Sequence, residues 1–332
     1  KGLYSALIIQ HLEEEFGRPI SDYFDMICGT STGGIIALAL SIKTPAFTIT
    51  EFYKNEGPKI FPFRNPNSFW SKVKQGFFRG KYSDSNLRVA LENVFGDMTM
   101  GDSQNLLCIP SFSLSRGMPR VFKFPHKEGC FNMDRNLKMV DVALATSAAP
   151  TFFPIAQIGN EQFVDGGLWA NNPALCGLAE ALKYFIGREQ PIITNRQDTD
   201  ALKNEGVLFD RYQILSISSI NVKSRPIRVA RDNPSFFSWG GELPNTSIDG
   251  QSFFTNFFLE SVKNSMLLNG VFHRIESPIL SVEQAKCMSL DNATNRSIDF
   301  MEIYGNAIGN EYRASKRHLV EPFFQNLKSY NT

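Results

Sequence analysis

The fold of this chain has to accommodate residues 25–38, DMICGTSTGGIIAL, in which a short apolar segment passes through glycines into a second apolar segment. Gly29, Ser31 and Gly33 form a G-x-S-x-G pattern. Between a strand and a helix, such glycines let the backbone turn sharply and lift the serine side chain into the open. The first N–H groups of the helix lack partners and lie at the positive end of its dipole, so they would stabilise an oxyanion. The segment predicts a strand, a turn that exposes Ser31 in a cleft, and a helix.

A turn that only packs a helix on a sheet is the alternative for these residues, since a five-residue pattern is frequent by chance. Gly34, Ala37 and Ala39 give the helix a small-residue side, and residues 26–28 have the apolar character of a buried strand. Such a helix can lie close to a sheet. The context therefore favours a nucleophilic Ser31.

The composition limits the classes of partner. With 332 residues, of which 42% are hydrophobic and 20% charged, the chain is long enough for one large domain or two small ones. A net charge of +1 provides no whole-molecule field for DNA or RNA, so neither polymer is an expected partner. Neither a long apolar run nor a signal-peptide pattern is present, which predicts a protein that neither spans a membrane nor is exported.

The cysteines predict neither a disulfide scaffold nor a metal site, because their number is odd, their spacing is wide and no C-x-x-C pair occurs. Most lie among apolar neighbours and are interpreted as small buried side chains in a reducing compartment, the cytoplasm. They are Cys28, Cys108, Cys130, Cys176 and Cys287.

Residues 54–81 differ from the rest of the chain, since they hold seven basic residues against one acid, Glu56, with aromatic residues between them. One interpretation is a solvated, irregular excursion whose aromatic side chains fold back on the core. The other is a surface for anionic lipid headgroups or a nucleotide-like effector. The residues predicted for this membrane or effector surface are Lys59, Arg64, Trp70, Lys72, Lys74 and Arg79.

Hydrophobic periodicity predicts strands that alternate with helices, and so an α/β fold. The expected helices are residues 3–16, 84–95, 140–149, 251–268 and 299–317, and the expected strands are 106–113, 120–124 and 212–220. The helix 251–268 is rich in phenylalanine, and its aromatic side is expected to pack in the core or as a lid.

A second strand-to-turn segment, QFVDGG at residues 162–167, carries a carboxylate where the first carries a hydroxyl. Asp165 precedes two glycines, and Asn172 with Pro173 then predicts the start of a helix. A serine hydroxyl is a weak nucleophile that needs a base within hydrogen-bond reach. Asp165 is the candidate base.

The segments around Ser31 and Asp165, together with ATSAAPTFFP at residues 145–154, resemble the patatin-like phospholipases over residues 1–220. The resemblance implies a three-layer α/β/α fold with a mostly parallel central sheet. It implies a serine lipid acyl hydrolase that cleaves ester-linked fatty acids from membrane phospholipids through an acyl-enzyme. The catalytic pair would be Ser31 and Asp165, without a histidine and without a metal.

The same resemblance assigns the oxyanion hole and the domains. The Thr32 amide would supply one half of the hole, and a glycine-rich loop, of which only Lys1 and Gly2 match the end, would supply the other. Gly29 and Gly33 would shape the elbow. Residues 1–222 would form the catalytic domain, and residues 223–332 a helical C-terminal extension packed on it.

The overall run of the chain, including LSISSIN at residues 215–221 and the C-terminal extension, more closely resembles bacterial CBASS antiphage effectors of the CapV-like kind. It implies activation by a cyclic di- or trinucleotide, no other cofactor, and assembly into a homo-oligomer on activation. It also implies a cytoplasmic protein that is peripheral to the inner membrane when active.

Three alternatives remain open from the sequence. The first is a Ser-Asp-His hydrolase, because His273 and His318 follow Asp165 in the required order. The second is a constitutive patatin-type lipase without nucleotide control. The third is a non-catalytic module that binds lipid or nucleotide.

Overall fold

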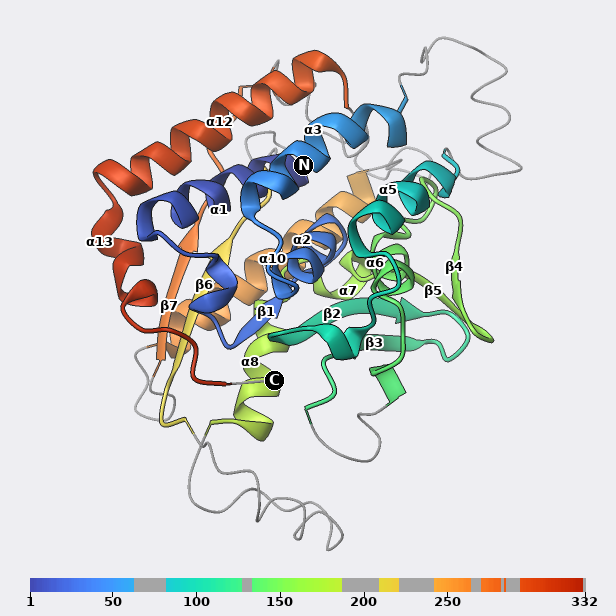
Figure 1. Ribbon diagram of the computed structural model, residues 1–332, viewed down its shortest axis with the longest axis horizontal. Helices are drawn as coiled ribbons and strands as arrows, with labels where there is room; N and C mark the ends of the chain where they lie inside the picture. Colours follow the sequence, from blue (N-terminus) through green and yellow to red (C-terminus); the bar gives the residue numbers. More distant parts are fainter. Residues whose placement is uncertain are drawn as a thin grey trace, which may run out of the picture.

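The computed structural model describes residues 1–62, 82–126, 133–186, 209–220, 242–263, 270–281, 284 and 293–330. Two β-sheets lie among helices (Figure 1). The helices before the second sheet are α1 (Gly2–Phe16), α2 (Thr32–Ser41), α3 (Ala46–Ile60), α5 (Ser85–Phe95), α6 (Met139–Ser147), α7 (Gly167–Ala170) and α8 (Ala174–Tyr184). Those after it are α10 (Glu242–Val262), α12 (Asn295–Ala314) and α13 (Arg317–Val320), and 3-10 turns cover Ile20–Asp22, Met100–Asp102 and Glu321–Phe324.

The first helix illustrates how local sequence sets the boundaries. Leu3, Leu7 and Ile8 recur at helical spacing and are buried. The helix ends where Gly17 adopts a φ of 76°, a left-handed conformation that glycine tolerates without steric cost. The predicted helix over residues 3–16 is confirmed.

The larger sheet contains β1 (Met26–Cys28), β2 (Leu106–Ser113), β3 (Met118–Lys123), β4 (Ala156–Ile158) and β5 (Glu161–Asp165). Among the described residues of this sheet, β1 pairs with β2 in parallel, and the pairs β2–β3, β2–β5 and β4–β5 are antiparallel. In the described residues the larger sheet is thus mixed, where a mostly parallel central sheet was expected. Short connections explain the mixture, because the two residues between β4 and β5 allow only an antiparallel hairpin.

Strands β1 and β5 occupy the same edge of β2, end to end. Residue Cys108 of β2 pairs with Cys28 on one edge and with Lys123 of β3 on the other. Ser111 likewise pairs with β3 and, on the opposite edge, with Asp165 of β5. Since β1 runs parallel to β2 and β5 antiparallel, their carboxyl ends point at each other. The turn after β1 and the turn after β5 are thereby brought together.

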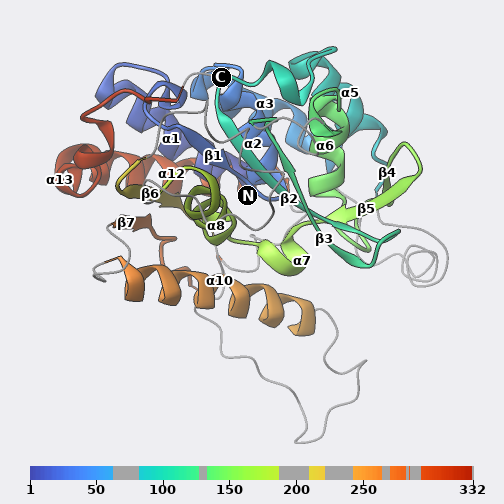
Figure 2. The same ribbon diagram turned by 90° about the horizontal axis from the view of Figure 1, so that it is seen from below.

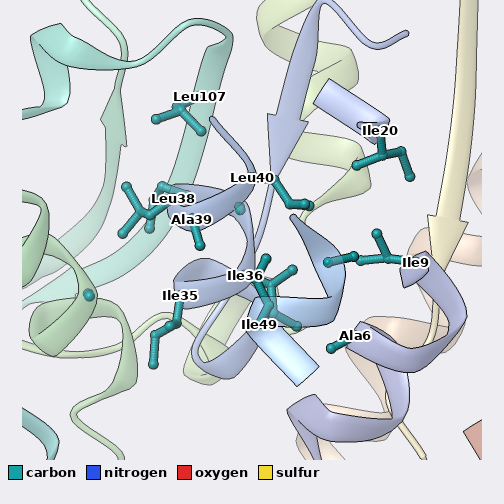
Figure 3. Close-up of a cluster of buried hydrophobic side chains, with 14 of the residues drawn as sticks. Ala6, Ile9, Ile20, Ile35, Ile36, Leu38, Ala39, Leu40, Ile49 and Leu107 are labelled. Atoms are coloured by element: carbon teal, nitrogen blue, oxygen red, sulfur yellow. The ribbon is translucent and has the colours of Figure 1, made fainter. Parts of the chain in front are cut away.

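Helices cover both faces of this sheet. Leu107 of β2 lies in the main hydrophobic cluster with α2 (Figure 3). The next residue, Cys108, points to the other face, because successive side chains of a strand alternate. On that face Gly177 of α8 lies so close to Cys28 that an added Cβ would be 2.6 Å from its sulfur. The predicted three-layer α/β/α arrangement is confirmed.

Helix α2 is buried over most of its length. Its side chains Ile36, Leu38 and Leu40 are at most 5% exposed, and α1, α3 and β2 surround them (Figure 3). Burying each such side chain stabilises the fold by roughly 1.5–3 kcal/mol. The helix that begins immediately after Ser31 is thus held from several sides.

The smaller sheet pairs β6 (Tyr212–Ile217) with β7 (Gly270–Ile275) in parallel. Strand β6 confirms the strand expected over residues 212–220, whereas β7 lies in the part of the chain that was expected to be helical. Helix α12 packs along α1 (Figure 1), where Gly305 and Gly309 approach the side chains of Leu7 and His11. The C-terminal part therefore packs on the N-terminal part through a helix pair as well as through a strand.

Candidate active site

Ser31 stands at a strained turn between β1 and α2. Its φ of 57° and ψ of −125° are values that residues with side chains rarely adopt. Gly29 makes the turn possible, since a Cβ there would lie 2.0 Å from the carbonyl oxygen of Gly33. Gly33 is different, because nothing lies within 4 Å of the position that its Cβ would take. The strand–turn–helix prediction is confirmed, and the two glycines of the pattern have unequal roles.

Asp165 lies at the end of β5 and faces the serine. The Ser31 hydroxyl donates a hydrogen bond of 2.6 Å to Asp165 Oδ2, and the Gly167 N–H donates one of 2.7 Å to Oδ1. The carboxyl group is buried, with 6% of the residue exposed. Burial raises its pKa to about 6, and the hydrogen bonds from Ser31 and Gly167, which favour the ionised form, oppose this rise only in part. A carboxylate with this pKa is a stronger base than an exposed aspartate.

Thr146 of α6 fixes the backbone of the serine. Its Oγ1 accepts a 3.1 Å hydrogen bond from the Ser31 N–H and donates a 2.6 Å hydrogen bond to the Pro110 carbonyl of β2. Gly34 lets α2 come this close, because a Cβ there would lie 2.7 Å from Thr146 Cγ2. No role was predicted for Thr146 from the sequence, where the available signal was a hydroxyl residue within a run of small apolar residues of the 145–154 motif.

Tyr53 of α3 links the two residues that were predicted to shape the oxyanion hole. Its hydroxyl donates a 2.7 Å hydrogen bond to the Thr32 carbonyl, and a Cβ on Gly2 would lie 2.6 Å from Tyr53 Cζ. Gly2 and Thr32 are therefore neighbours across the phenol ring. In the described part of the chain the Thr32 N–H makes no hydrogen bond, as expected for the first amide of a helix. No sequence pattern pointed to Tyr53.

A cleft of about 1320 Å³ surrounds the two facing side chains. Both Ser31 and Asp165 line it, as do Thr32 and Gly33. Its apolar lining includes side chains of two helices, α3 and α5, and of the segments that follow α3 and α6, namely Phe52, Ile60, Phe61, Leu87, Phe152 and Phe153. Ligand pockets commonly enclose about 300–1,000 Å³, so the cleft has room for a long apolar chain.

None of the four histidines, all of which the structure describes, lines this cleft. His273 Nε2 lies 3.0 Å from the Tyr312 hydroxyl, on the face of β7 that α12 covers. His318 belongs to α13. The geometry gives the Ser-Asp-His alternative no support.

The predicted basic surface falls largely outside the described residues, which exclude Arg64, Trp70, Lys72, Lys74 and Arg79. Residues 54–60 are not irregular, because they form the last turns of α3. Lys59 forms an ion pair of 2.7 Å with Glu56, and Lys54 one of 2.7 Å with Glu302. These two lysines are thus paired within the chain.

An α/β fold, a serine held at a strand-to-helix turn and an apolar cleft around its hydroxyl together define an ester hydrolase of the kind that acts on lipids. The family model described as patatin-like phospholipase matches residues 1–175. The chain belongs to the patatin-like phospholipase family.

Three relatives show how far the similarity extends. The chain is 30% identical to a protein of Pseudomonas aeruginosa named cGAMP-activated phospholipase, over 99% of this chain and 89% of that one. A protein of the same name from Escherichia coli is also 30% identical, over 99% of this chain and 91% of its own length. Patatin-like protein 3 of Arabidopsis thaliana is 31% identical over 65% of this chain and 54% of its own.

A helix needs about 20 predominantly apolar residues to span a bilayer, and the helices in the described ranges fall short of this requirement. None of them is both long enough and apolar enough to cross a membrane.

Proposed function

We propose that this protein is a serine lipid acyl hydrolase that cleaves fatty acids from membrane phospholipids with Ser31 and Asp165 as its catalytic pair. The observation that carries the proposal is the 2.6 Å hydrogen bond from the Ser31 hydroxyl to a buried Asp165 carboxylate inside an apolar cleft. A nucleophile, its base and a site for an acyl chain thereby share one space.

In the first half of the reaction, Ser31 Oγ attacks the ester carbonyl carbon while Asp165 accepts the hydroxyl proton. The N–H groups of Thr32 and Gly2 donate to the oxyanion, which neighbours the positive end of α2. The tetrahedral intermediate collapses by breaking the bond to the lysolipid oxygen, which takes the proton back from Asp165. The acyl group remains on Ser31.

In the second half, Asp165 removes a proton from water, and the resulting hydroxide equivalent attacks the acyl-serine carbonyl. The C–O bond to Ser31 breaks, Ser31 recovers its proton from Asp165, and the fatty acid leaves. Asp165 must be ionised at the start of each half. The raised pKa of Asp165 makes it a better proton acceptor than an ordinary aspartate and leaves it ionised at neutral pH.

Control by a cyclic nucleotide is the second part of the proposal. It is supported by the full-length similarity to relatives named cGAMP-activated phospholipase. In this proposal residues 1–222 form the catalytic domain, residues 223–332 form the extension, and a cyclic di- or trinucleotide with homo-oligomer assembly switches on an antiphage effector. The protein then works in the cytoplasm at the inner membrane.

Fatty acid release from phospholipid vesicles, measured by mass spectrometry with and without a panel of cyclic di- and trinucleotides, tests the proposal. Wild-type protein is expected to release fatty acid only with one of the nucleotides, and Ser31→Ala and Asp165→Ala are expected to lose at least 10³-fold. Ser147→Ala is the matched control, because Ser147 lines the same cleft but donates to the Ala143 carbonyl within α6.

Each other outcome selects an alternative. Release without any nucleotide would identify a constitutive lipase, and no release under any condition would favour a non-catalytic binding module. Full activity in Ser31→Ala would disprove the catalytic pair.

A further inference from the structure

The outward side of α10 carries three phenylalanines that face solvent. Phe253, Phe254 and Phe257 are 72%, 59% and 62% exposed. Figure 2 shows α10 along one side of the molecule, with α7 on its inner side. These three residues, called here the aromatic face, were expected in the core or in a lid, and the structure places them outside.

Over residues 252–257 the polarity of α10 is inverted relative to a helix that packs on a protein and faces water, whereas Leu259 farther along the helix is buried in the usual way. Ser252 and Thr255 point inward and are only 8% exposed, while the phenylalanines between and after them point outward. Contiguous exposed apolar surface of this kind marks an interaction site. The inversion indicates that the outer side of α10 is built to meet a medium other than water.

The inner side of α10 is bonded to the residues that follow Asp165. Asn171 Nδ2 donates a 2.9 Å hydrogen bond to Ser252 Oγ, and Gln251 Nε2 donates a 2.7 Å hydrogen bond to the Leu168 carbonyl. Leu168 and Ser252 line the same cleft as Ser31. Leu168 is also 44% exposed, so apolar surface lies at the rim of the cleft beside α10.

We infer that the aromatic face inserts into the interfacial layer of a phospholipid bilayer and sets the rim of the cleft against it. This inference rests on the proposed function, because the acyl chains of the substrate must pass from a bilayer into the cleft. Phenylalanine side chains on a helix that lies in the interface plane bind in this way.

Area and position favour a bilayer over a second copy of the chain. The exposed parts of the three phenylalanines amount to about 400 Å², roughly half of what each partner buries in a stable protein interface. A second chain seated beside Leu168 would also narrow the entrance through which the substrate arrives.

The absence of basic residues in α10 distinguishes binding through the aromatic face from electrostatic binding to anionic lipid. The helix contains no lysine or arginine, and the carboxylates of Asp249 and Glu260 belong to exposed residues. Binding through the aromatic face is therefore apolar and needs no anionic lipid. Binding through the basic excursion at residues 54–81 would instead depend on anionic lipid and weaken with salt.

Vesicle flotation with Ser31→Ala protein, which leaves the lipid intact, tests the docking surface apart from catalysis. The triple variant Phe253→Ser/Phe254→Ser/Phe257→Ser in this background is expected to bind phosphatidylcholine vesicles at least tenfold more weakly. Phe47→Ser is the matched control, because Phe47 is a 59% exposed phenylalanine of α3; its binding should change less than twofold. Raising the salt from 50 to 500 mM should leave the affinity of the Ser31→Ala protein for the vesicles unchanged.

A second arm uses the active chain with the nucleotide panel present. The triple variant should hydrolyse a soluble short-chain ester at the wild-type rate and vesicle lipid at least tenfold more slowly. If wild-type protein hydrolysed neither substrate, the proposed function would fail, whereas the flotation result would still decide the docking surface.

A second measurement does not depend on the folding of the triple variant, because it uses a single substitution that adds a fluorescence signal. Phe257→Trp should add fluorescence that brominated phosphatidylcholine quenches. Unchanged flotation of the triple variant, lack of quenching, or binding that requires anionic lipid and disappears at 500 mM salt would overturn the inference. So would a lipid-free dimer that the triple variant disrupts while vesicle binding persists.

Discussion

The two walls of the cleft are built in opposite ways. The wall that carries Ser31 is closed by backbone approaches that leave no room for a methyl group, with added Cβ atoms 2.0 Å from Gly33 at Gly29 and 2.2 Å from Pro110 at Gly166. The wall formed by α8, α10 and the smaller sheet has its own small cluster, composed of Leu178, Tyr212, Leu259 and Phe272. Its outer side leaves large apolar side chains in solvent.

The contrast separates two requirements of one reaction. The proposed proton transfer between Ser31 and Asp165 would need atoms held to within a few tenths of an ångström, and close backbone packing provides this. A lipid surface needs an adaptable apolar contact and no fixed partner. Substitutions at the close approaches of the first wall should therefore change both activity and stability, and those of the exposed side chains on the outer side of the second wall should change neither in the absence of lipid.

The strongest test of the tight wall compares its two elbow glycines. Gly29→Ala is expected to destabilise the fold by about 3 kcal/mol or more and to lower activity at least 10³-fold, since its Cβ would overlap the Gly33 carbonyl. Gly33→Ala should fold with equal or slightly greater stability, because the site is open and alanine favours a helix. Denaturant unfolding and an ester hydrolysis assay measure both effects. Similar behaviour of the two variants would contradict the unequal roles.

Asp165→Asn should separate activity from stability. Loss of the base is expected to lower hydrolysis about 10³-fold. The raised folded-state pKa of about 6 means that ionised Asp165 destabilises the fold as pH rises from about 4 through 6. The neutral variant should therefore be more stable by about 1–3 kcal/mol at pH 7, with no gain at pH 4. If urea unfolding gave Asp165→Asn and the wild type equal stability at both pH values, burial would not raise the pKa of Asp165.

Thr146→Val should have an intermediate effect. The variant keeps the shape of the side chain but leaves the Ser31 N–H and the Pro110 carbonyl without their partner. A cost of about 1–3 kcal/mol in stability follows for the buried groups, with roughly tenfold lower activity from a displaced serine. Thr146→Ser, which retains the hydroxyl, is the control and should restore most of the activity.

The pH profile of the wild type should show a smaller change. Because Asp165 must be ionised to accept a proton, kcat/KM should fall on the acid side with an apparent pKa of about 6. Activity at pH 5 is expected to be about tenfold lower than the plateau above pH 7. A plateau that extends down to pH 4.5, measured with a soluble ester, would show that Asp165 keeps an ordinary pKa.

The smallest effect is expected in the loose wall. Phe253→Ser should change the free energy of unfolding by no more than about 0.5 kcal/mol, since a side chain that is 72% exposed makes few contacts to lose. Thermal unfolding without lipid checks this value. A loss of several degrees would mean that the aromatic face packs on the protein.

The sequence predicted what local patterns determine. The turn at Ser31, the carboxylate at Asp165 and the boundaries of α1 follow from residues within a few positions of each other. The antiparallel placement of β5 could not be predicted in this way, because it depends on which edge of β2 remains free. The contacts of Thr146 and Tyr53 with the elbow span 115 and 21 residues and leave no local pattern.

The aromatic face was missed for a different reason. The spacing of Phe253, Phe254 and Phe257 predicts one apolar side of a helix, but periodicity gives no information on which side meets the protein. The inward position of Ser252 and Thr255 becomes visible only once α10 is placed against α7.

Because β1 and β5 lie end to end along β2, the length of β2 between them sets the distance between Ser31 and Asp165. Only Ile109 and Pro110 separate the residues of β2 that pair with Cys28 and Asp165. A slip of either strand by one residue would move the proposed catalytic side chain at its end by about 3.3 Å and turn it to the opposite face of the sheet. The hydrogen bond between Ser31 and Asp165, which are far apart in sequence, thus depends on the number of residues in β2 between the two pairings. An insertion or deletion inside β2 would therefore break the hydrogen bond between Ser31 and Asp165 even if both residues were kept.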